Sequence, residues 1–151
     1  MLRISKKLLF AIEAVLDIAY NAGTEPVQSG EITERQGIPK RYLEQVLQQL
    51  VREGVLSGVR GPRGGYRLAR ERRRITLGEI VRVIRSMENA EDPLEIPSGA
   101  LLGQMVVRPL WQEMQEACMS NLDTMTIEDL CLRARKAGVP SESDNRIDFA
   151  I

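Results

Sequence analysis

One short segment constrains the fold of this chain more than any other: a basic, glycine-rich turn between two short apolar runs. The turn reads Arg60-Gly61-Pro62-Arg63-Gly64-Gly65-Tyr66-Arg67, and it follows an amphipathic helical pattern. Residues 55–59 and 66–69 on its two sides have the length and composition of strands, so the glycines are predicted to form the tip of a β-hairpin. A helix followed by such a hairpin indicates a winged helix, although a flexible, solvated hairpin gives the same local pattern.

The chemistry of this turn suits a polyanion that lies in a groove. Arginines can neutralise phosphates or enter the minor groove of DNA, and glycines let the backbone approach the sugar-phosphate wall. A nucleotide-binding P-loop would need Gly-Lys-Ser/Thr after its spacer, and this turn has no lysine. We therefore predict a DNA-binding wing at residues 57–68, with contacts from Arg60, Gly61, Arg63, Gly64 and Arg67.

Two helices joined by a tight turn are predicted just before the wing, after a scaffold helix that Ser5 caps and Gly23 ends. Ser29 is placed to cap the first of the two, and Gly37 suits a left-handed stop. Pro39 lies in the first turn of the second helix, which we place at residues 39–53. This spacing is that of a helix-turn-helix.

The second helix divides into an apolar face and a polar face. Leucines and valines at 43, 46, 47, 50 and 51 share one side. The other side is rich in groups that hydrogen-bond to bases or phosphates. The predicted DNA contacts of this helix are Lys40, Arg41, Tyr42, Glu44, Gln45 and Gln48. For any single one of them, an ordinary solvated helix face is nearly as good an interpretation.

A formal net charge of zero conceals an uneven distribution. Residues 1–87 hold 16 Lys and Arg against 9 Asp and Glu, a net charge of +7, whereas residues 88–151 hold 5 against 12, a net charge of −7. The basic half contains the predicted helix-turn-helix and wing, which favours double-stranded DNA as the partner over a chance distribution of solvated charge.

The acidic half is predicted to be helical after a linker. Thr76 and Glu79 form a capping box for the helix that completes a DNA-binding domain at 1–87. An acidic linker follows at 88–100, then a long amphipathic helix and a shorter one that Thr126 caps, within 101–140. A polar tail occupies 141–151.

The long helix, from about Leu101 to Asn121, has too little of the chain to cover its apolar side. Pairing with a second copy is the simplest solution, although packing onto the winged domain is an alternative. Pro109 either kinks this helix or begins its continuous part. The predicted dimer contacts are Leu101, Met105, Leu110, Trp111, Met114 and Cys118. The predicted fold class is α+β, mostly helical, a winged helix-turn-helix with a C-terminal dimerisation helix.

Composition disfavours several classes of protein. The sequence has no His and only Cys118 and Cys131, so it lacks a disulfide framework, the commonest general base and the commonest zinc ligand. It also lacks an apolar run of about 18 residues and the apolar stretch of a signal peptide. We expect a cytoplasmic protein that is not an enzyme and has no membrane partner.

Three segments carry a resemblance to a known family: residues 35–39 (RQGIP), 42–45 (YLEQ) and 59–68 (VRGPRGGYRL). With 109–111 and 122–127, they are similar to the Rrf-type winged-helix repressors, which include the iron-sulfur cluster regulator, the nitrite-sensing repressor and the cysteine-metabolism repressor. The match extends from Met1 to about Ala137. The resemblance implies a homodimer whose recognition helices enter successive major grooves of an imperfect palindrome. It also implies that Arg41 and Glu44 read bases and that Arg60 occupies the minor groove.

The chain departs from the cluster-binding members of this family. Those members carry three closely spaced cysteines between the helix after the wing and the dimerisation helix, whereas residues 88–108 here contain none. We expect no iron-sulfur cofactor and no metal, and we expect both cysteines to pack on apolar helix faces, with thiol oxidation as the alternative. Carboxylates at 91, 92 and 95 could hold a hard cation, but an acidic linker is usually solvated.

Two questions stay open at this level. The signal is unknown, and a small-molecule effector or partner protein is expected near Met105, Trp111 and Met114, where a shift would change the spacing of the recognition helices. The rival function is a winged-helix protein-interaction module that acts through the acidic half. The basic residues of the helix and wing favour DNA.

Overall fold

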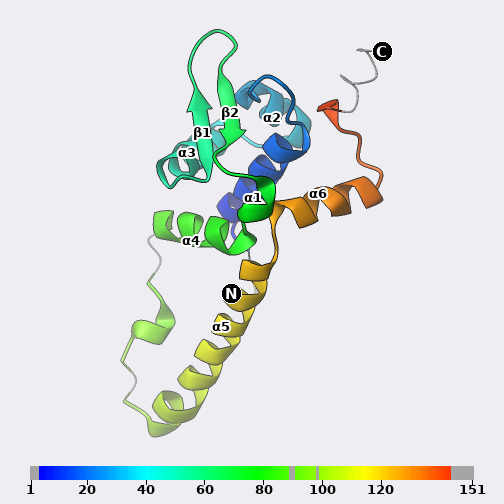
Figure 1. Cartoon of the computed structure of the whole chain (residues 1–151). Coiled ribbons are helices and arrows are strands. Elements are labelled where there is room, and N and C mark those ends of the chain that lie inside the picture. Colours follow the sequence, from blue (N-terminus) through cyan, green and yellow to red (C-terminus); the bar gives the residue numbers. More distant parts are fainter. Residues whose placement is uncertain (1–3, 89–90, 98, 144–151) are drawn as a thin grey trace.

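Helices make up most of the computed structural model, which describes residues 4–88, 91–97 and 99–143 (Figure 1). Together with one small sheet they confirm the predicted mostly helical α+β class. The elements are α1 (Lys6–Tyr20), α2 (Ser29–Gln36), α3 (Lys40–Arg52), β1 (Leu56–Val59), β2 (Gly65–Leu68), η1 (Arg72–Arg74), α4 (Leu77–Met87), η2 (Pro93–Glu95), η3 (Gly103–Val107), α5 (Arg108–Thr124) and α6 (Ile127–Lys136).

The core is built around α1, which packs against α2, α3, α4 and α6. Its small and branched side chains Ala14 and Val15 are completely buried. The predicted apolar face of α3 is confirmed, since all its members are buried except Val51, which is half-buried. Burial of each such Leu or Val contributes about 1.5–3 kcal/mol, so α3 is held firmly from one side while its other side faces solvent.

Local capping sets the helix boundaries. Ser5 caps α1 as predicted, because its Oγ accepts from the N–H of Leu8 at 3.1 Å. The helix ends at Tyr20 and not near Gly23. Asn21 is its C-cap, and both the backbone N–H and the Nδ2 of Asn21 donate to the carbonyl of Asp17. The predicted capping box of α4 and the Thr126 cap of α6 are present.

The turn between α2 and α3 departs from the prediction at two residues. Gln28, and not Ser29, is the N-cap of α2, and its N–H donates to the Glu31 carboxylate at 2.8 Å. Gly37 ends α2 in the left-handed region with a φ of 67°, as predicted. Pro39 was predicted within the first turn of α3 but is its N-cap, because its ψ of 132° is not helical.

The two strands form the predicted hairpin, antiparallel and in the register Leu56 opposite Leu68 and Val59 opposite Gly65. The hairpin projects from the helical body next to α3 (Figure 1). An isolated bridge anchors it, because Val27 and Tyr66 exchange backbone hydrogen bonds of 3.0 and 2.8 Å.

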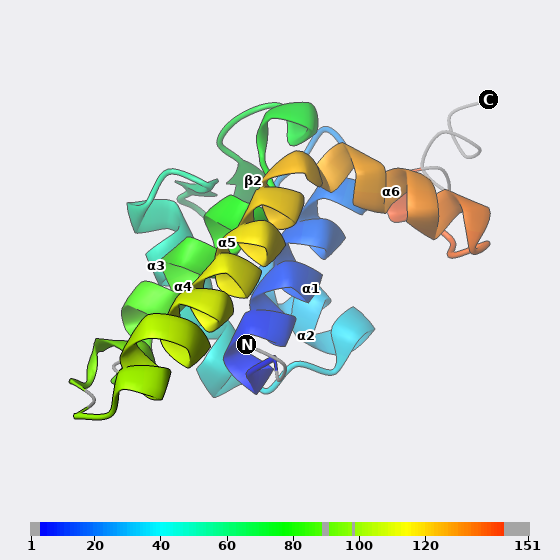
Figure 2. The same ribbon diagram turned by 90° about the horizontal axis from the view of Figure 1, so that it is seen from below.

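Helix α5 extends away from the winged part and contacts α4 (Figures 1 and 2). None of its residues is buried in this chain. Pro109 lies in its first turn, directly after the π-helical residues of η3, so it marks the beginning of the regular helix. The C-terminal end of α5 is fixed by Asp123, whose carboxylate accepts both hydrogen bonds of the Arg82 guanidinium at 2.6 and 2.7 Å.

In the basic run after the wing, Arg70 pairs with Glu79, Arg72 with Glu128 and Arg73 with Glu71. One expectation about the end of the chain is corrected. The tail does not begin at residue 141, since Ser141 is buried and donates to the carbonyl of Tyr20 at 2.7 Å. The rest of the predicted tail, 144–151, and residues 1–3 lie outside the described residues. Among those described, no helix is both long and apolar enough to cross a membrane.

Candidate nucleic-acid interface

The solvent side of α3 presents the polar side chains expected there. Five of the six predicted contacts on this helix are exposed: Lys40, Arg41, Glu44, Gln45 and Gln48. They occupy the side opposite the buried leucines, so their donors and acceptors are not used by the core. An exposed helix face of this width fits the major groove of duplex DNA.

Tyr42, the sixth predicted contact, is half-buried. Its ring packs on Phe10 of α1, with ring centroids 5.8 Å apart and an interplanar angle of 55°. The Arg41 guanidinium lies 5.6 Å from the centroid of the same ring, which is a cation-π distance. Tyr42 therefore supports the position of Arg41, and its own contact with DNA stays a prediction.

A cleft of about 590 Å³ joins α3 to the wing. Gln48 and Arg52 line it from the helix, and Gly58, Arg60 and Tyr66 line it from the hairpin. The fold thus brings together Gln48 and Arg60, which sequence reasoning had assigned to two separate elements. It also adds Arg52, an exposed basic residue of α3 that is not among the predicted contacts.

Glycine is required in the wing for close backbone packing. A Cβ on Gly64 would lie 2.2 Å from the carbonyl oxygen of Val59, and a Cβ on Gly65 would lie 2.4 Å from that of Val27. Gly61 has a φ of 114°, which favours glycine. The sequence predicted glycines that approach DNA, and the structure shows that two of them are needed by the hairpin itself.

Several basic groups of the interface already have partners within the chain. Lys40 lies 3.8 Å from Glu44, Arg63 lies 3.6 Å from Glu25, and Arg67 donates to the carbonyl of Thr24 at 2.7 Å. The two ion pairs are exposed and are worth at most about 1 kcal/mol each, so a phosphate can displace them. Of the described residues in the wing, Arg60 is the arginine without a hydrogen-bond or ion-pair partner.

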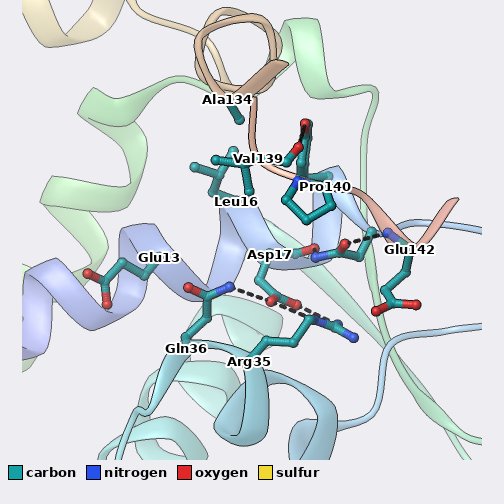
Figure 3. A pocket seen from close by; sticks show the side chains of 11 residues that line it. Glu13, Leu16, Asp17, Arg35, Gln36, Ala134, Val139, Pro140 and Glu142 are labelled. Carbon is teal, nitrogen blue, oxygen red and sulfur yellow. Dashed lines mark hydrogen bonds and ion pairs between the residues drawn. The ribbon is translucent and has the colours of Figure 1, made fainter. Parts of the chain in front are cut away.

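Sequence reasoning missed the group that positions α2. The Asp17 carboxylate of α1 is buried and accepts from Nε and Nη2 of Arg35 at 2.9 and 2.8 Å, and from Nε2 of Gln36 at 2.8 Å (Figure 3). The hydrogen bonds that Arg35 donates to Asp17 raise the pKa of Arg35 above its usual value, so the guanidinium keeps its charge. The signal available in the sequence was Asp17 itself, an acidic residue at a position of α1 that is buried.

Comparison with known proteins identifies this architecture. Residues 4–133 match the sequence profile of the Rrf2 family, described as iron-dependent transcriptional regulators. The chain belongs to the Rrf2 family. It is 34% identical over 130 residues to the HTH-type transcriptional regulator IscR of Klebsiella pneumoniae, covering 85% of this chain and 79% of that protein. The chain is therefore a DNA-binding transcriptional regulator and not an enzyme, as predicted.

Solved structures of Rrf2 regulators share the fold. The IscR of T. potens superimposes with a TM-score of 0.73 at 33% identity, over 91% of this chain and 92% of that one. CymR, the global cysteine regulator of B. subtilis, superimposes with a TM-score of 0.72 at 31% identity, over 88% and 98%. These matches confirm the winged-helix prediction.

The residues present do not fit the iron or iron-sulfur site that the family description implies. The sequence holds two cysteines and no histidine. Cys131 is buried in α6, as predicted, whereas Cys118 is exposed on α5, so the expectation that it packs in the core is wrong for the single chain. Asp92 accepts from the N–H of Leu94, and no group of three metal-ligating side chains forms among the described residues.

Proposed function

We propose that this Rrf2 regulator binds an imperfect palindrome in duplex DNA as a homodimer and represses transcription from it. The cleft shared by α3 and the wing carries this proposal, because it joins Gln48 of the recognition helix to Arg60 and Arg52 at the basic end of the chain. A helix in the major groove with an arginine beside it is suited to read base edges and to follow the phosphate backbone at the same time.

The contact residues divide into two roles. Glu44 and Gln48 carry hydrogen-bonding groups that distinguish bases in the major groove. Arg60 and Arg63 at the wing add attraction that depends little on sequence. The other proposed contacts are Lys40, Arg41, Tyr42, Gln45, Gly61, Gly64 and Arg67.

A second copy of the chain is the proposed cover of α5 and the residues before it. Leu101 and Met105 are 72% and 71% exposed, and Leu110 and Met114 are 52% and 53% exposed. Trp111 and Cys118 are exposed on the same helix. An apolar surface this large is rarely left in water, and two-fold pairing would bury it while leaving both basic winged halves free.

No iron-sulfur cluster or metal takes part in the proposed function. The missing cysteines between 88 and 108 support this, as does the separation of Cys118 and Cys131 on different helices. Control by a small molecule or a partner protein is proposed instead, since a repressor needs a signal that changes its affinity for DNA.

Salt dependence tests the DNA interface. Affinity for a duplex selected from genomic fragments should fall linearly on log-log axes, with a slope of about −0.9 per phosphate neutralised, and Arg60→Ala should reduce that slope by about one unit. Arg73→Ala is the matched control, because Arg73 is exposed but paired with Glu71 on η1. A slope unchanged by Arg60→Ala would contradict the role of the wing.

Base discrimination and assembly are tested separately. Glu44→Ala should compress the ranking of operator variants by about 1–3 kcal/mol while binding to random DNA is retained. Light scattering should give a dimer at micromolar concentration, and Leu110→Glu with Met114→Glu should give monomers. A monomeric wild type would contradict the proposed dimer. An unchanged ranking of the operator variants would contradict the assignment of Glu44 as a base-reading residue.

A further inference from the structure

A cavity of about 500 Å³ lies away from the DNA-reading surface. Helix α1 forms its floor, the end of α2 forms one side, and α6 with residues 139–142 forms the other (Figure 3). This volume is within the range of small-molecule sites.

Hydrogen bonds fix the wall that follows α6. The Tyr20 hydroxyl donates to the carbonyl of Val139 at 2.5 Å, and Ser141 Oγ donates to the carbonyl of Tyr20 at 2.7 Å. The N–H of Glu142 donates to Asn21 Oδ1 at 3.0 Å. Three hydrogen bonds thus attach the segment to Tyr20 and Asn21 at the end of α1, which makes the cavity a built feature of the fold.

The lining has an excess of negative charge. Asp17 and Arg35 neutralise each other through their paired hydrogen bonds. Glu13 and Glu142 add two further carboxylates, so three carboxylates share the one guanidinium of Arg35, which also attracts Glu142. Glu13 and Glu142 lie at opposite ends of the cavity in Figure 3. A ligand that satisfies both ends must carry two positive charges that are separated from each other.

One side of the cavity between those carboxylates is apolar. Leu16, Ala134, Val139 and Pro140 line it, and Gln36, Asp17 and Arg35 lie across from them in Figure 3. Methylene groups would be desolvated there, at a gain of about 0.8 kcal/mol for each one that is fully buried. A ligand with two ammonium groups joined by methylenes matches this arrangement, in which a carboxylate lies at each end of an apolar wall.

We propose that this cavity binds a linear aliphatic diamine or polyamine, with one ammonium at Glu13 and another at Glu142. The ligand also regulates DNA binding, a step that rests on the proposed function. Arg35 and Gln36 are both cavity residues and the last residues of α2, and only Gly37, Ile38 and Pro39 separate them from the recognition helix. A bound cation close to the Asp17–Arg35 pair therefore acts on the element that orients α3.

Calorimetry on the full chain without DNA tests the site. Titration with 1,4-diaminobutane and with spermidine should show saturable binding of one molecule per chain. The monoamine 1-aminobutane should bind at least about tenfold more weakly, because it can satisfy only one carboxylate. Glu13→Gln combined with Glu142→Gln should weaken diamine binding by a similar factor or more. A thermal melt of this double variant checks that it folds.

The matched control removes two exposed carboxylates outside the cavity, in Glu113→Gln with Glu116→Gln on α5. Diamine binding should persist in this variant, which has the same net charge as the cavity variant. The proposal would be overturned if both variants lost diamine binding equally, or if the wild type showed no saturable binding at millimolar diamine. Tighter binding of butyrate than of diamine would also overturn it, since Arg35 would then be the anchor.

DNA affinity is measured afterwards, with and without diamine, on the wild type and on the cavity variant. Amines also bind DNA directly, so the two proteins must be compared. Diamine should change the DNA affinity of the wild type by a factor at least threefold larger than the factor by which it changes that of the cavity variant. Saturable binding with no such difference would overturn the regulatory step. Failure of the untreated wild type to bind any selected duplex would overturn the proposed function and leave the amine site standing.

Discussion

The ion pair between Asp17 and Arg35 gives the sharpest test of how the winged domain is held together. The side chain of Asp17 is 0% exposed and that of Arg35 is 23% exposed. Arg35→Ala removes two hydrogen bonds from a carboxylate that stays buried and retains Gln36 as its other side-chain partner. Breaking a buried pair in this way costs about 3–5 kcal/mol, and the partial exposure of Arg35 places the expected loss near about 3 kcal/mol.

Urea unfolding at one fixed protein concentration measures this loss, since a dimer's stability depends on concentration. For a slope of about 2 kcal/mol per molar urea, the midpoint should fall by roughly 1.5 M. Arg73→Ala is the control, because Arg73 and Glu71 are both exposed and should cost at most about 1 kcal/mol. The Arg35 variant should also lose DNA affinity, since the pair connects α2 to α1.

The double variant Asp17→Ala with Arg35→Ala completes the cycle. With both charges removed, no unpaired carboxylate remains in the core, so the double variant should be more stable than the sum of the two single losses by about 1–3 kcal/mol. Strict additivity, or a loss from Arg35→Ala no larger than that from Arg73→Ala, would refute the reasoning that the buried carboxylate dominates.

Three further outcomes are expected. Gly64→Ala places a Cβ 2.2 Å from a backbone carbonyl oxygen, so the hairpin must shift and DNA affinity should fall by at least about tenfold, or about 1.4 kcal/mol, in a titration by fluorescence anisotropy. Hydrogen bonding to Arg82 lowers the pKa of Asp123. The Asp123 carboxylate therefore stabilises the fold fully above its unfolded pKa of about 3.9, and this stabilisation is lost as the pH falls through the lower folded pKa. In thermal melts measured over a range of pH, Asp123→Asn should remove this acid-dependent loss of stability. Burial raises the pKa of Cys131, so a thiol reagent should react with at most one cysteine per chain of the native protein, the exposed Cys118. Reaction of a second cysteine in the native protein would contradict the packing of α6.

Local sequence signals gave the helix-turn-helix and the wing because each depends on interactions within a few residues. Gly37 ends α2 by its left-handed conformation, and the Thr76 and Glu79 side chains cap α4 three residues apart. The glycines of the turn set the position of the hairpin tip, and the leucine spacing set the buried face of α3. Patterns of this kind are visible in a linear sequence because the partners are sequence neighbours.

Long-range pairings could not be predicted in the same way. Ser141 looked like the first residue of a polar tail, yet it bonds to Tyr20 across the chain. Cys118 shares an apolar pattern with α5, but nothing in the single chain covers it. The arginines after the wing have acidic partners that include Glu128, far away in the sequence. Each outcome depends on which elements the fold brings together.

The sequence by itself determined most of the buried helix faces, where the helix-turn-helix and the wing lie, and which half of the chain is basic, because periodicity, capping and charge are properties of neighbouring residues. Only the tertiary structure decided that Asp17 holds Arg35 and Gln36, that Gln48 and Arg60 share one cleft, and that Glu13 and Glu142 face a common cavity. These pairings connect residues up to 129 positions apart. The packing of α1 against its neighbouring helices brings these residues together, and no local sequence pattern predicts which residues meet.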